Sequence, residues 1–493
     1  MRILLIYPEY PATFWSFKYA LKFIGKRAAL PPLGLLTIGA MLPKEWPKKL
    51  VDLNVMKLRD KDLEWADWVF ISGMVLQRAS AREIIARCKA TNVKVIAGGP
   101  LFTSEYDQFE DVDHFVLNEA ELTLPPFLAD LKKGCAQHIY ETSEFCDIHE
   151  TPSPLWELID LKHYATMGIQ FSRGCPFNCD FCNITALFGH RSRMKTAQQV
   201  IAELDGLYNL GWRGPGFFVD DNFIGNKGYL KNHLLPALIQ WQKNRKGFPF
   251  NTEASVNLAD DPALMEMMVK AGFDSVFIGI ETPNEESLGE CNKQQNQNRD
   301  LIESVKLMQR AGLQVQGGFI VGFDSDTPSI FQRQIEFIQK SGIVTAMVGL
   351  LNAPPGTRLH QRMREEGRLI DAMSGDNADG STNILPRMGL DVLREGYGNL
   401  MQHIYAPEHY YKRAKTFLRE YKAPKITAPW DLQRLLAVLR SSVRLGIIGE
   451  ERFQYWKIMF WTLFRRPKML PLAITLAIYG HHFRKVCKVK IVP

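Results

Sequence analysis

The first part of the chain alternates short apolar runs with longer segments in which apolar residues recur at helical spacing. Each apolar run has the length of a buried strand, and the amphipathic segment after it has the pattern of a helix. The runs predict strands at 2–7, 50–55, 67–73, 93–100 (with its terminal glycine turn) and 113–118, and helices at 31–41, 79–91 and 119–132. Strands that alternate with helices form parallel sheets covered by helices on both faces. We therefore predict a doubly wound, Rossmann-like α/β domain over residues 1–140.

The carboxyl ends of these predicted strands carry small and polar residues. Ligands of such sheets bind beyond the carboxyl edge, and glycine there lets a bulky ligand approach the backbone. Ordinary tight turns have the same composition, so this feature alone identifies no ligand. The candidate binding residues at this edge are Ser72, Gly73, Gly98, Gly99, Asn118 and Glu119.

The alternation starts again near residue 166, after a segment with few periodic positions. We interpret 141–165, which contains Pro152 and Pro154, as a linker. Six strand–helix units with right-handed crossovers make an open barrel, whereas a complete barrel needs eight. The sequence predicts a partial barrel over 166–370, with strands at 168–172, 216–220, 250–255, 275–280, 313–321 and 345–351, and helices at 196–210, 230–243, 262–271, 298–311, 329–341 and 358–366.

The repeat stops after residue 369. A polar loop at 371–383 leads into a helical pattern from 391 onward, so we predict a helical C-terminal domain over 371–493. Two apolar runs there, 458–464 and 470–479, are too short to span a bilayer and are separated by basic residues. Such helices either lie on a membrane surface or form a cap packed on the barrel, and the pattern leaves both open.

The composition is that of an ordinary globular protein. The chain has 493 residues, of which 46% are hydrophobic and 23% charged, and its net charge of +7 is modest and spread out, so no nucleic-acid partner is expected. Eight cysteines are too few for a disulfide scaffold and fit a reducing compartment. The N-terminal apolar run is too short for a signal peptide. We expect a cytoplasmic protein, with membrane association through the C-terminal region as the open alternative.

Three of the cysteines form a compact motif directly after the first predicted barrel strand. Cys175, Cys179 and Cys182 are spaced C-x3-C-x2-C. A [4Fe–4S] cluster normally takes four thiolates, so three leave one iron open to a substrate or cofactor. The alternative is a zinc site, but zinc needs a fourth ligand and usually a second pair, and only His190 lies nearby in the sequence.

This spacing after a first barrel strand resembles the radical S-adenosylmethionine (SAM) enzymes. The resemblance implies a [4Fe–4S] cluster whose open iron chelates SAM, and one-electron cleavage of SAM to a 5′-deoxyadenosyl radical. A doubly wound domain before such a barrel is similar to the cobalamin-binding module of one large subfamily. No D-x-H-x-x-G motif is present and the first histidine is His114, so a histidine lower ligand to cobalt from this domain is not implied.

Three segments place the resemblance within the group of cobalamin-binding radical SAM proteins that includes the hopanoid C-2 methylase. They are FFVDDNFIG at 217–225, Ser72-Gly-Met74, and the Pro31-Pro32-x-Gly34-Leu-Leu36 start of a helix. The C-terminal helical region also looks like the tail domain of that group.

The resemblance implies several SAM-binding positions at the barrel strand ends. Phe181 takes the place of an aromatic residue near the adenine, and Asp220 or Asp221 would hold the SAM ammonium unless they cap the following helix. Glu253 and Ser255 would hold the ribose or methionyl group.

The fourth and fifth strands end in segments similar to two further SAM-binding segments of the family. Gly279 and Glu281 would lie alongside SAM, although Glu281 is equally suited to a salt bridge with a barrel arginine. Gly318 and Gly322 would flank the adenine; in a strand, glycine also serves close packing.

The activity implied by the resemblance is methylation of an unactivated carbon in a lipid-like or other apolar substrate. One SAM would methylate cobalamin and a second would yield the radical, with electrons from a donor such as flavodoxin or ferredoxin. Two alternatives stay open: a cyclase or oxidoreductase that uses the same cofactors without methyl transfer, and a binding protein that senses a cofactor or redox state.

Overall fold

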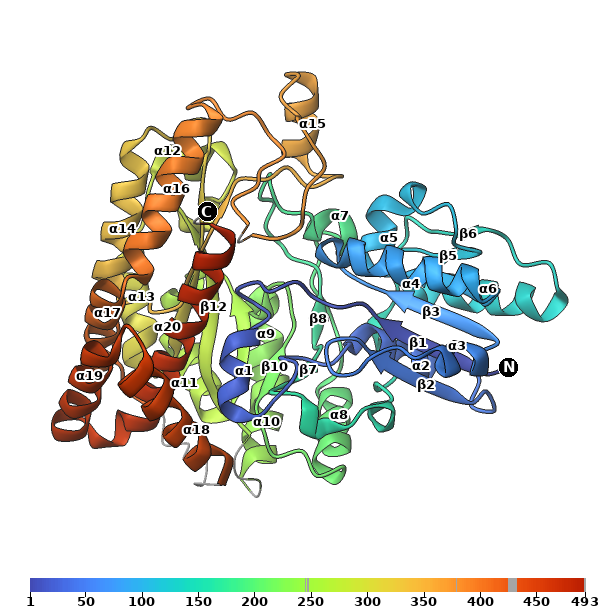
Figure 1. Cartoon of the computed structure of the whole chain (residues 1–493), viewed down its shortest axis with the longest axis horizontal. Coiled ribbons are helices and arrows are strands. Elements are labelled where there is room, and N and C mark those ends of the chain that lie inside the picture. The colour runs from blue at the N-terminus through green and yellow to red at the C-terminus, as the bar shows by residue number, and fades with distance from the viewer. Residues whose placement is uncertain (244, 246–247, 378, 424–431, 492–493) are drawn as a thin grey trace.

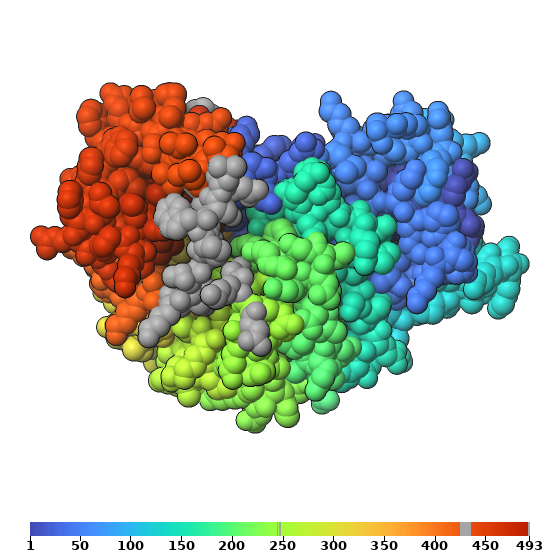
Figure 2. Space-filling model, turned by 90° about the horizontal axis from the view of Figure 1, so that it is seen from below, coloured from blue at the N-terminus to red at the C-terminus, as the bar shows by residue number. Residues whose placement is uncertain are grey.

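The structure, a computed structural model, contains two six-stranded parallel sheets, a short antiparallel strand pair and a lobe of C-terminal helices (Figure 1). It describes residues 1–243, 245, 248–377, 379–423 and 432–491. Seen from below, the N-terminal domain and the C-terminal lobe lie at opposite ends of the molecule, and the barrel lies between them (Figure 2). The predicted α/β fold class is confirmed.

The N-terminal sheet is parallel throughout, in the order β2-β1-β3-β4-β5-β6. The strand order reverses at β1, because β2 lies on one side of it and the later strands lie on the other. Doubly wound sheets bind ligands at the carboxyl edge where such a reversal occurs, which here is between β1 and β3, where Ser72 and Gly73 lie. The elements of this domain are β1 (Ile3–Tyr7), α2 (Leu33–Met41), β2 (Lys48–Asp52), α3 (Asp60–Trp65), β3 (Trp68–Ser72), α4 (Arg78–Ala90), β4 (Lys94–Gly98), α5 (Pro100–Glu105), β5 (His114–Val116), α6 (Ala120–Lys133) and β6 (Ile139–Tyr140).

The second sheet keeps its six strands in chain order, and every pairing is parallel. Strands that stay neighbours in sequence, each followed by a helix, form part of a (β/α) barrel, so the predicted partial barrel is confirmed. Its elements are β7 (Met167–Ile169), α7 (Ile184–Phe188), α8 (Ala197–Asn209), β10 (Gly216–Phe218), α9 (Lys227–Tyr229), α10 (Leu235–Gln242), β11 (Phe250–Ala254), α11 (Pro262–Ala271), β12 (Phe273–Glu281), α12 (Glu285–Glu290), α13 (Leu301–Ala311), β13 (Gln314–Val321), α14 (Ser329–Ser341), β14 (Ala346–Leu350) and α15 (Arg358–Glu365).

The first barrel strand is shorter than the predicted 168–172, because β7 ends at Ile169. The carboxylate of Asp220 accepts hydrogen bonds from the backbone N–H groups of Phe171 and Ser172, which turn the chain out of the sheet. The chain then forms β8 (Ser172–Arg173), which pairs antiparallel with β9 (Arg193–Met194). This pair closes the base of the cysteine-containing segment 174–192.

The C-terminal helices pack on the outside of the barrel, as the cap interpretation predicts. Tyr397 donates its hydroxyl to the Val348 carbonyl at 3.0 Å, and the buried Arg413 donates to the Val344 carbonyl at 3.2 Å. Among the described helices, none is both long and apolar enough to cross a membrane. The helices are α16 (Leu390–Tyr405), α17 (Pro407–Glu420), α18 (Leu432–Val443), α19 (Arg452–Arg465) and α20 (Leu470–Lys490).

A short N-terminal helix, α1 (Lys18–Ile24), lies against α18 and α20 rather than beside its own sheet (Figure 1). The buried His482 ring donates from Nε2 to the Phe14 carbonyl at 3.0 Å. Arg440 donates to the Phe23 carbonyl at 3.0 Å. The sequence assigns this segment to the first domain, because no periodic pattern indicates a partner more than 400 residues away.

The polar segment 371–383 forms a loop, as predicted, over the residues described. It reaches the N-terminal domain, where Arg78 donates to the Met373 carbonyl at 3.1 Å. Gly375, at φ +77°, lies so close to the Leu76 backbone that an added Cβ would approach its nitrogen to 2.8 Å. This loop therefore joins the barrel to the carboxyl edge of the first sheet.

Candidate functional site

The three predicted cluster ligands lie together on the loop between β8 and α7. Cys179 is buried, Cys175 and Cys182 are half-buried, and none forms a disulfide. Burial raises the pKa of all three thiols, that of Cys182 to about 12, and the neighbouring Cys179 raises the pKa of Cys175 and Cys182 further. The effect of Cys179 on both other thiols is consistent with three sulfurs that lie on one short loop.

The donor chemistry of this loop fits an iron–sulfur cluster. Within the described part of the chain, no three His, Cys, Asp or Glu side chains lie within reach of a single metal ion. A four-iron cubane is held at separate irons, so its ligands stand further apart than those of one ion. Thiolates are the ligands that such clusters take. Cys175, Cys179 and Cys182 are therefore suited to three corners of a cluster.

The entry to the loop is fixed by a glycine and by the two adjacent carboxylates. Gly174 has φ +89°, and an added Cβ would lie 2.6 Å from the Arg191 carbonyl oxygen. Its N–H donates to Asp221 at 3.0 Å, just as Asp220 accepts from the preceding backbone. Burial raises the pKa of Asp220 to about 7 and of Asp221 to about 6. Both carboxyl groups thus hold backbone, and their contact with SAM stays a prediction.

The far side of the loop is held by residues that follow β12 and begin α15. The N–H of Asp180 donates to the Cys291 carbonyl at 3.0 Å, and the side chain of Asn292 donates to the Asn178 carbonyl at 2.8 Å. Leu359, in the first turn of α15, donates its N–H to the Asp180 carbonyl at 3.0 Å. The loop is therefore clamped by two barrel units besides its own.

Glu281 forms an ion pair, with a lysine rather than the arginine considered from the sequence. Its Oε1 lies 2.7 Å from Lys293 Nζ, and both side chains are largely buried. Glu281 has φ +61° at an irregularity in the register of β12, and an added Cβ on Gly279 would lie 2.4 Å from Glu281 Oε1. Glu281 and Cys179 raise the pKa of Lys293 although its burial acts in the opposite direction. Gly279 thus leaves room for the pair.

Two amide side chains that the sequence analysis missed contact the cysteine sulfurs. Asn222 Nδ2 lies 3.9 Å from Cys175 Sγ and 3.2 Å from Ser255 Oγ, and Gln295 Nε2 lies 3.7 Å from Cys179 Sγ. Asn222 directly follows the predicted aspartate pair, which is a usable signal. No local pattern marks Gln295 or Lys293, because they lie in an irregular segment.

Among the described residues, the side chain of Glu253 forms no hydrogen bond or ion pair. It lies half-buried on β11, two residues before Ser255, and no group in the described part of the chain donates a hydrogen bond to its carboxylate. Burial, then the carboxyl groups of Asp221 and Asp220, raise its pKa to about 7. An unpaired carboxyl group near Asp220 and Asp221, which hold the entry of the cysteine loop, suits the ammonium or hydroxyl donors of SAM. The residues present therefore fit SAM, and the roles predicted for Glu253 and Ser255 stay predictions.

The positions predicted to flank adenine have packing roles in the protein alone. An added Cβ on Gly318 would lie 2.7 Å from the Phe277 ring, and one on Gly322, at φ +106°, would lie 3.0 Å from Leu393. The Phe181 ring packs against Phe323 with centroids 6.4 Å apart. Their contacts with adenine are untested and stay predictions.

At the carboxyl edge of the N-terminal sheet, the predicted turns touch one another. An added Cβ on Gly99, at φ +84°, would lie 2.3 Å from Ser72 Oγ, and one on Gly98 would lie 2.5 Å from the Val116 carbonyl oxygen. Asn118 has φ +60° and donates its N–H to Thr103 Oγ1 at 3.0 Å. This edge, with Gly73, presents backbone and small side chains.

The chemistry of this edge fits a cobalamin held by shape and backbone groups, without a histidine ligand to cobalt from this domain. The first histidine, His114, begins β5 at the opposite, amino edge, where its Nδ1 contacts the Gln137 carbonyl at 2.6 Å. The contacts predicted for cobalamin stay predictions.

Glu119 lies at this edge but is already engaged in a buried ion network. It pairs with Arg173 at 3.1 Å and Arg193 at 2.8 Å, and accepts the Cys146 N–H at 2.7 Å. Glu121 pairs with Arg173 at 2.7 Å. The arginines belong to β8 and β9, so the network joins the first sheet directly to the base of the cysteine loop.

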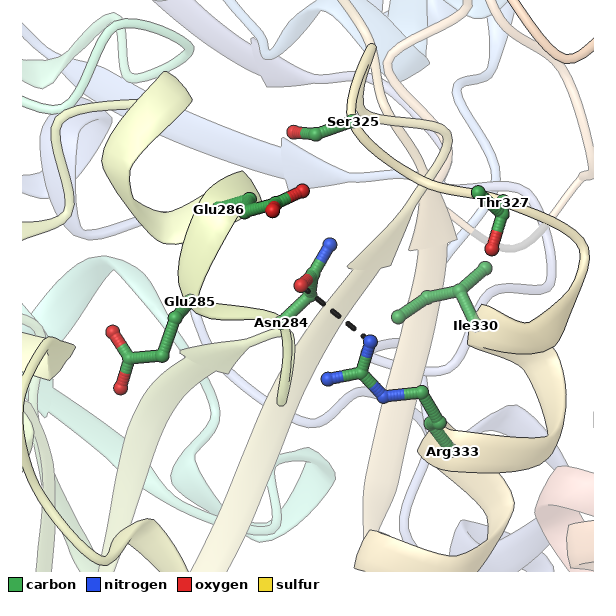
Figure 3. A pocket seen from close by; sticks show the side chains of 7 residues that line it. All are labelled: Asn284, Glu285, Glu286, Ser325, Thr327, Ile330 and Arg333. Carbon is green, nitrogen blue, oxygen red and sulfur yellow. Dashed lines mark hydrogen bonds between the residues drawn. The ribbon is translucent and has the colours of Figure 1, made fainter.

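A surface cavity of about 400 Å³ lies between the start of α12 and the start of α14 (Figure 3). Arg333 spans one side of it and donates to the Asn284 side chain at 3.5 Å and to the Pro283 carbonyl at 3.1 Å. No predicted cofactor residue lines the cavity, so it is separate from the cysteine site. Its lining residues are Asn284, Glu285, Glu286, Ser325, Thr327, Ile330 and Arg333.

Family models match the barrel and the C-terminal region, and two relatives match nearly the whole chain. Residues 169–338 match the radical SAM superfamily, and residues 357–491 match a domain of unknown function, DUF4070. An uncharacterized methyltransferase of Synechocystis is 41% identical over 98% of this chain and 91% of its own. The hopanoid C-2 methylase of Rhodopseudomonas palustris is 34% identical over 98% of this chain and 92% of its own.

Two solved structures share the fold at low sequence identity. The radical SAM methyltransferase TsrM of Kitasatospora setae, with cobalamin and a [4Fe–4S] cluster bound, has a TM-score of 0.57 and 14% identity, covering 74% of this chain and 78% of its own. The cobalamin-dependent radical SAM enzyme OxsB, with aqua-cobalamin and SAM bound, has a TM-score of 0.63 and 14% identity, covering 99% of this chain and 80% of its own. With the full-length identity to its relatives, these findings show that the chain belongs to the cobalamin-binding-domain-containing radical SAM enzymes, in the group that includes the hopanoid C-2 methylase.

Proposed function

We propose that the protein is a cobalamin-dependent radical SAM methyltransferase that acts on an unactivated carbon of a lipid-like substrate. The observation that carries the proposal is that Cys175, Cys179 and Cys182 share one loop whose entry is held by Asp221, and that the unpaired carboxyl group of Glu253 lies near Asp221. Methyl transfer is supported by the names of the two relatives that match the full chain, and a lipid substrate by the hopanoid C-2 methylase.

When bound, the cluster, SAM and cobalamin together supply a radical that removes a hydrogen atom from the substrate and a methyl group that replaces it. The chain's own residues bind and orient these groups. The three thiolates would hold the cluster, and the amides of Asn222 and Gln295 reach two of the sulfurs, where hydrogen bonds would influence cluster potential. Ser255 contacts Asn222, Glu253 lies near Asp221, and both would orient SAM.

Cobalamin would lie at the carboxyl edge of the first sheet. The strand order reverses between β1 and β3, where doubly wound sheets bind ligands, and the ion network of Glu119 ties this edge to the cysteine loop. An external donor such as flavodoxin or ferredoxin would supply electrons to the cluster.

The test uses anaerobically purified, reconstituted protein with SAM labelled in its methyl group, a reductant, cobalamin and a hopanoid lipid extract. We expect iron and corrin absorbance, formation of deoxyadenosine, and label in the lipid fraction. Cys182→Ala should lose cluster iron and deoxyadenosine formation, whereas Cys135→Ala, at an exposed cysteine far from the loop, should retain both.

Three other outcomes would contradict the cluster site, the methyl transfer or the enzyme activity, respectively. Deoxyadenosine formation at the parental rate in Cys182→Ala would show that the cysteine loop does not hold the catalytic cluster. SAM cleavage without transfer of label to any acceptor would favour cyclisation or oxidation. Binding of cofactors without SAM cleavage would favour a sensing role.

A further inference from the structure

Exposed apolar side chains gather on the outside of the C-terminal lobe. They lie on the Arg444–Ile448 segment and on α19, at the end of the molecule remote from the first sheet (Figures 1 and 2). Ile448, Phe453 and Phe464 are 72%, 74% and 79% exposed, far more than a packed cap requires. We name this surface the α19 outer face; it comprises Ile447, Ile448, Phe453, Phe460, Leu463 and Phe464.

These side chains form one continuous surface. Phe453, Phe460 and Phe464 recur at intervals of seven and four residues, which places them on one side of a helix. Trp456 connects this stripe to the preceding segment, since its ring stacks on Phe460 at 5.6 Å and its Nε1–H donates to the Gly446 carbonyl at 2.9 Å. The opposite side of α19 is buried against α17 and α20.

Cations surround the apolar stripe. Lys415 and Arg419 of α17 lie over the Trp461 ring at 5.2 and 5.8 Å, beside Lys457 and Arg465 of α19. Burial, then the charges of Arg419, Lys457 and Arg465, lower the pKa of Lys415, which shows that the four cations are close. Within the described part of the chain, none of the four forms an ion pair with a carboxylate.

Positive charge is also concentrated at the C-terminal end of the sequence. From Arg452 to the end, the chain has nine Lys or Arg and no Asp or Glu, although the whole chain has a net charge of only +7. The expectation of an evenly spread charge is therefore wrong, because the C-terminal helices hold more positive charge than the whole chain has in net.

We propose that the α19 outer face docks the protein on a bilayer surface that contains anionic lipids. Exposed Phe, Leu and Ile between cations are the composition of a helix that lies in the membrane interface, with aromatic and aliphatic groups at the acyl boundary and cations at the head groups. An acidic protein partner would pair with the cations and leave the apolar stripe unburied. A second copy of the chain would bring like charges together across a two-fold interface. The docking face contains no residue of the cofactor site, so this inference does not depend on methyl transfer.

The first measurement is co-sedimentation of the full, reconstituted protein with vesicles of phosphatidylcholine alone or with added phosphatidylglycerol. We expect binding to the phosphatidylglycerol vesicles and little binding to phosphatidylcholine. Raising the salt concentration from about 0.1 M to about 1 M shortens the Debye length from about 10 Å to about 3 Å and should release most of the protein. Equal binding to both vesicles, or none to either, would overturn the proposal.

Two double variants test the two halves of the surface. Each cation near an anionic surface contributes about 1 kcal/mol, or about fivefold in binding, so Lys457→Glu with Arg465→Glu should weaken vesicle binding by about 25-fold or more. Phe453→Ser with Phe460→Ser should weaken it at least about tenfold through the loss of buried apolar area. Controls are Lys57→Glu with Lys61→Glu and Leu210→Ser, exposed positions outside this lobe, which should bind as the parent does.

Light scattering measures the oligomeric state of each variant, and the cluster iron content shows whether the variant has folded. The charge variants alter only exposed side chains, so they keep the test valid if the Phe variants fail to fold. Unchanged vesicle binding in both double variants would contradict the proposal. A dimeric parent that the Phe variants convert to a monomer, without vesicle binding, would identify the face as a contact between copies instead.

Discussion

At the scale of single residues, Glu253 makes stability depend on pH. In the folded protein its pKa is raised from 4.5 to about 7, mainly by burial. Between these two values the folded state retains a proton that the unfolded state has lost, so stability falls as the pH rises. We expect the cofactor-free protein to lose about 1–2 kcal/mol from this residue between about pH 5 and about pH 8, less than the full shift implies because the side chain is part exposed.

Urea unfolding at a series of pH values measures this dependence. Glu253→Gln should remove this part of the slope and leave the rest, including that from the buried Asp220. The same slope in the parent and in the variant would assign the effect to other groups.

The buried pair of Glu281 and Lys293 gives a second residue-scale prediction. Lys293→Met leaves the Glu281 carboxylate buried without its cation, which costs about 3–5 kcal/mol in comparable pairs. Adding Glu281→Gln removes the unpaired charge, so the double variant should recover a large part of that loss. Denaturant unfolding of the cofactor-free chain measures both.

The control for the pair is Lys306→Met, which breaks a more exposed ion pair with Glu420. Such pairs contribute about 0–1 kcal/mol, so the change should be small. A double variant as unstable as Lys293→Met alone would show that packing, and not the unpaired charge, causes the loss.

At the scale of elements, the cysteine loop depends on the glycine at its entry. Gly174 and Gly211 have nearly the same φ, +89° and +91°, but an added Cβ meets backbone oxygen at 2.6 Å only at Gly174 and nothing within 4 Å at Gly211. Gly211→Ala should therefore cost only the backbone strain, about 1–2 kcal/mol. Gly174→Ala should cost more and displace the loop, with lower iron content after reconstitution.

Thermal unfolding and iron per chain separate these two effects. Equal iron content and equal loss of stability in the two variants would show that the loop tolerates the displacement. A glycine is also required in β12. At the register irregularity of this strand, Glu281 turns back toward Lys293 and leaves Gly279 no space for a side chain.

At the scale of the whole molecule, the network around Arg173 couples the first sheet to the cysteine loop. Arg173→Met removes the cation shared by Glu119 and Glu121, both buried. We expect a loss of about 3–5 kcal/mol and faster proteolysis within 141–165, because the two sheets would separate more often. Limited trypsin digestion of the cofactor-free protein measures this.

The matched control is Arg87→Met, which breaks an exposed pair with Asp60 on the surface of the first domain. It should leave the digestion rate within 141–165 unchanged. Equal rates in Arg173→Met and the parent would show that other contacts, such as the loop at 371–383, are sufficient to hold the domains together.

Most of the strands and helices, and the kind of cofactor site, could be predicted from local patterns in the sequence. Strands and helices follow from apolar periodicity, which is a local property of the chain, and it predicted five of the six strands of the first sheet and all six of the second; the two-residue strand β6 was missed because it is too short to show a pattern. The spacing of Cys175, Cys179 and Cys182 is also local, so it pointed to the family, which the relatives confirm, and it predicted the cluster ligands. Asp220 shows the limit of this reasoning, because its carboxylate accepts hydrogen bonds from backbone 48 residues away and shortens the predicted first strand.

Contacts between residues far apart in the chain could be seen only in the folded structure. Gln295 and Cys179 are 116 residues apart, Arg193 and Glu119 are 74 apart, and His482 and Phe14 are 468 apart. No spacing rule encodes such contacts, because they depend on how the sheets and helices are placed against one another after each has formed. The exposed face of α19 follows the same principle: the sequence shows that the helix is apolar and basic, but only the packing shows which side is left to the solvent.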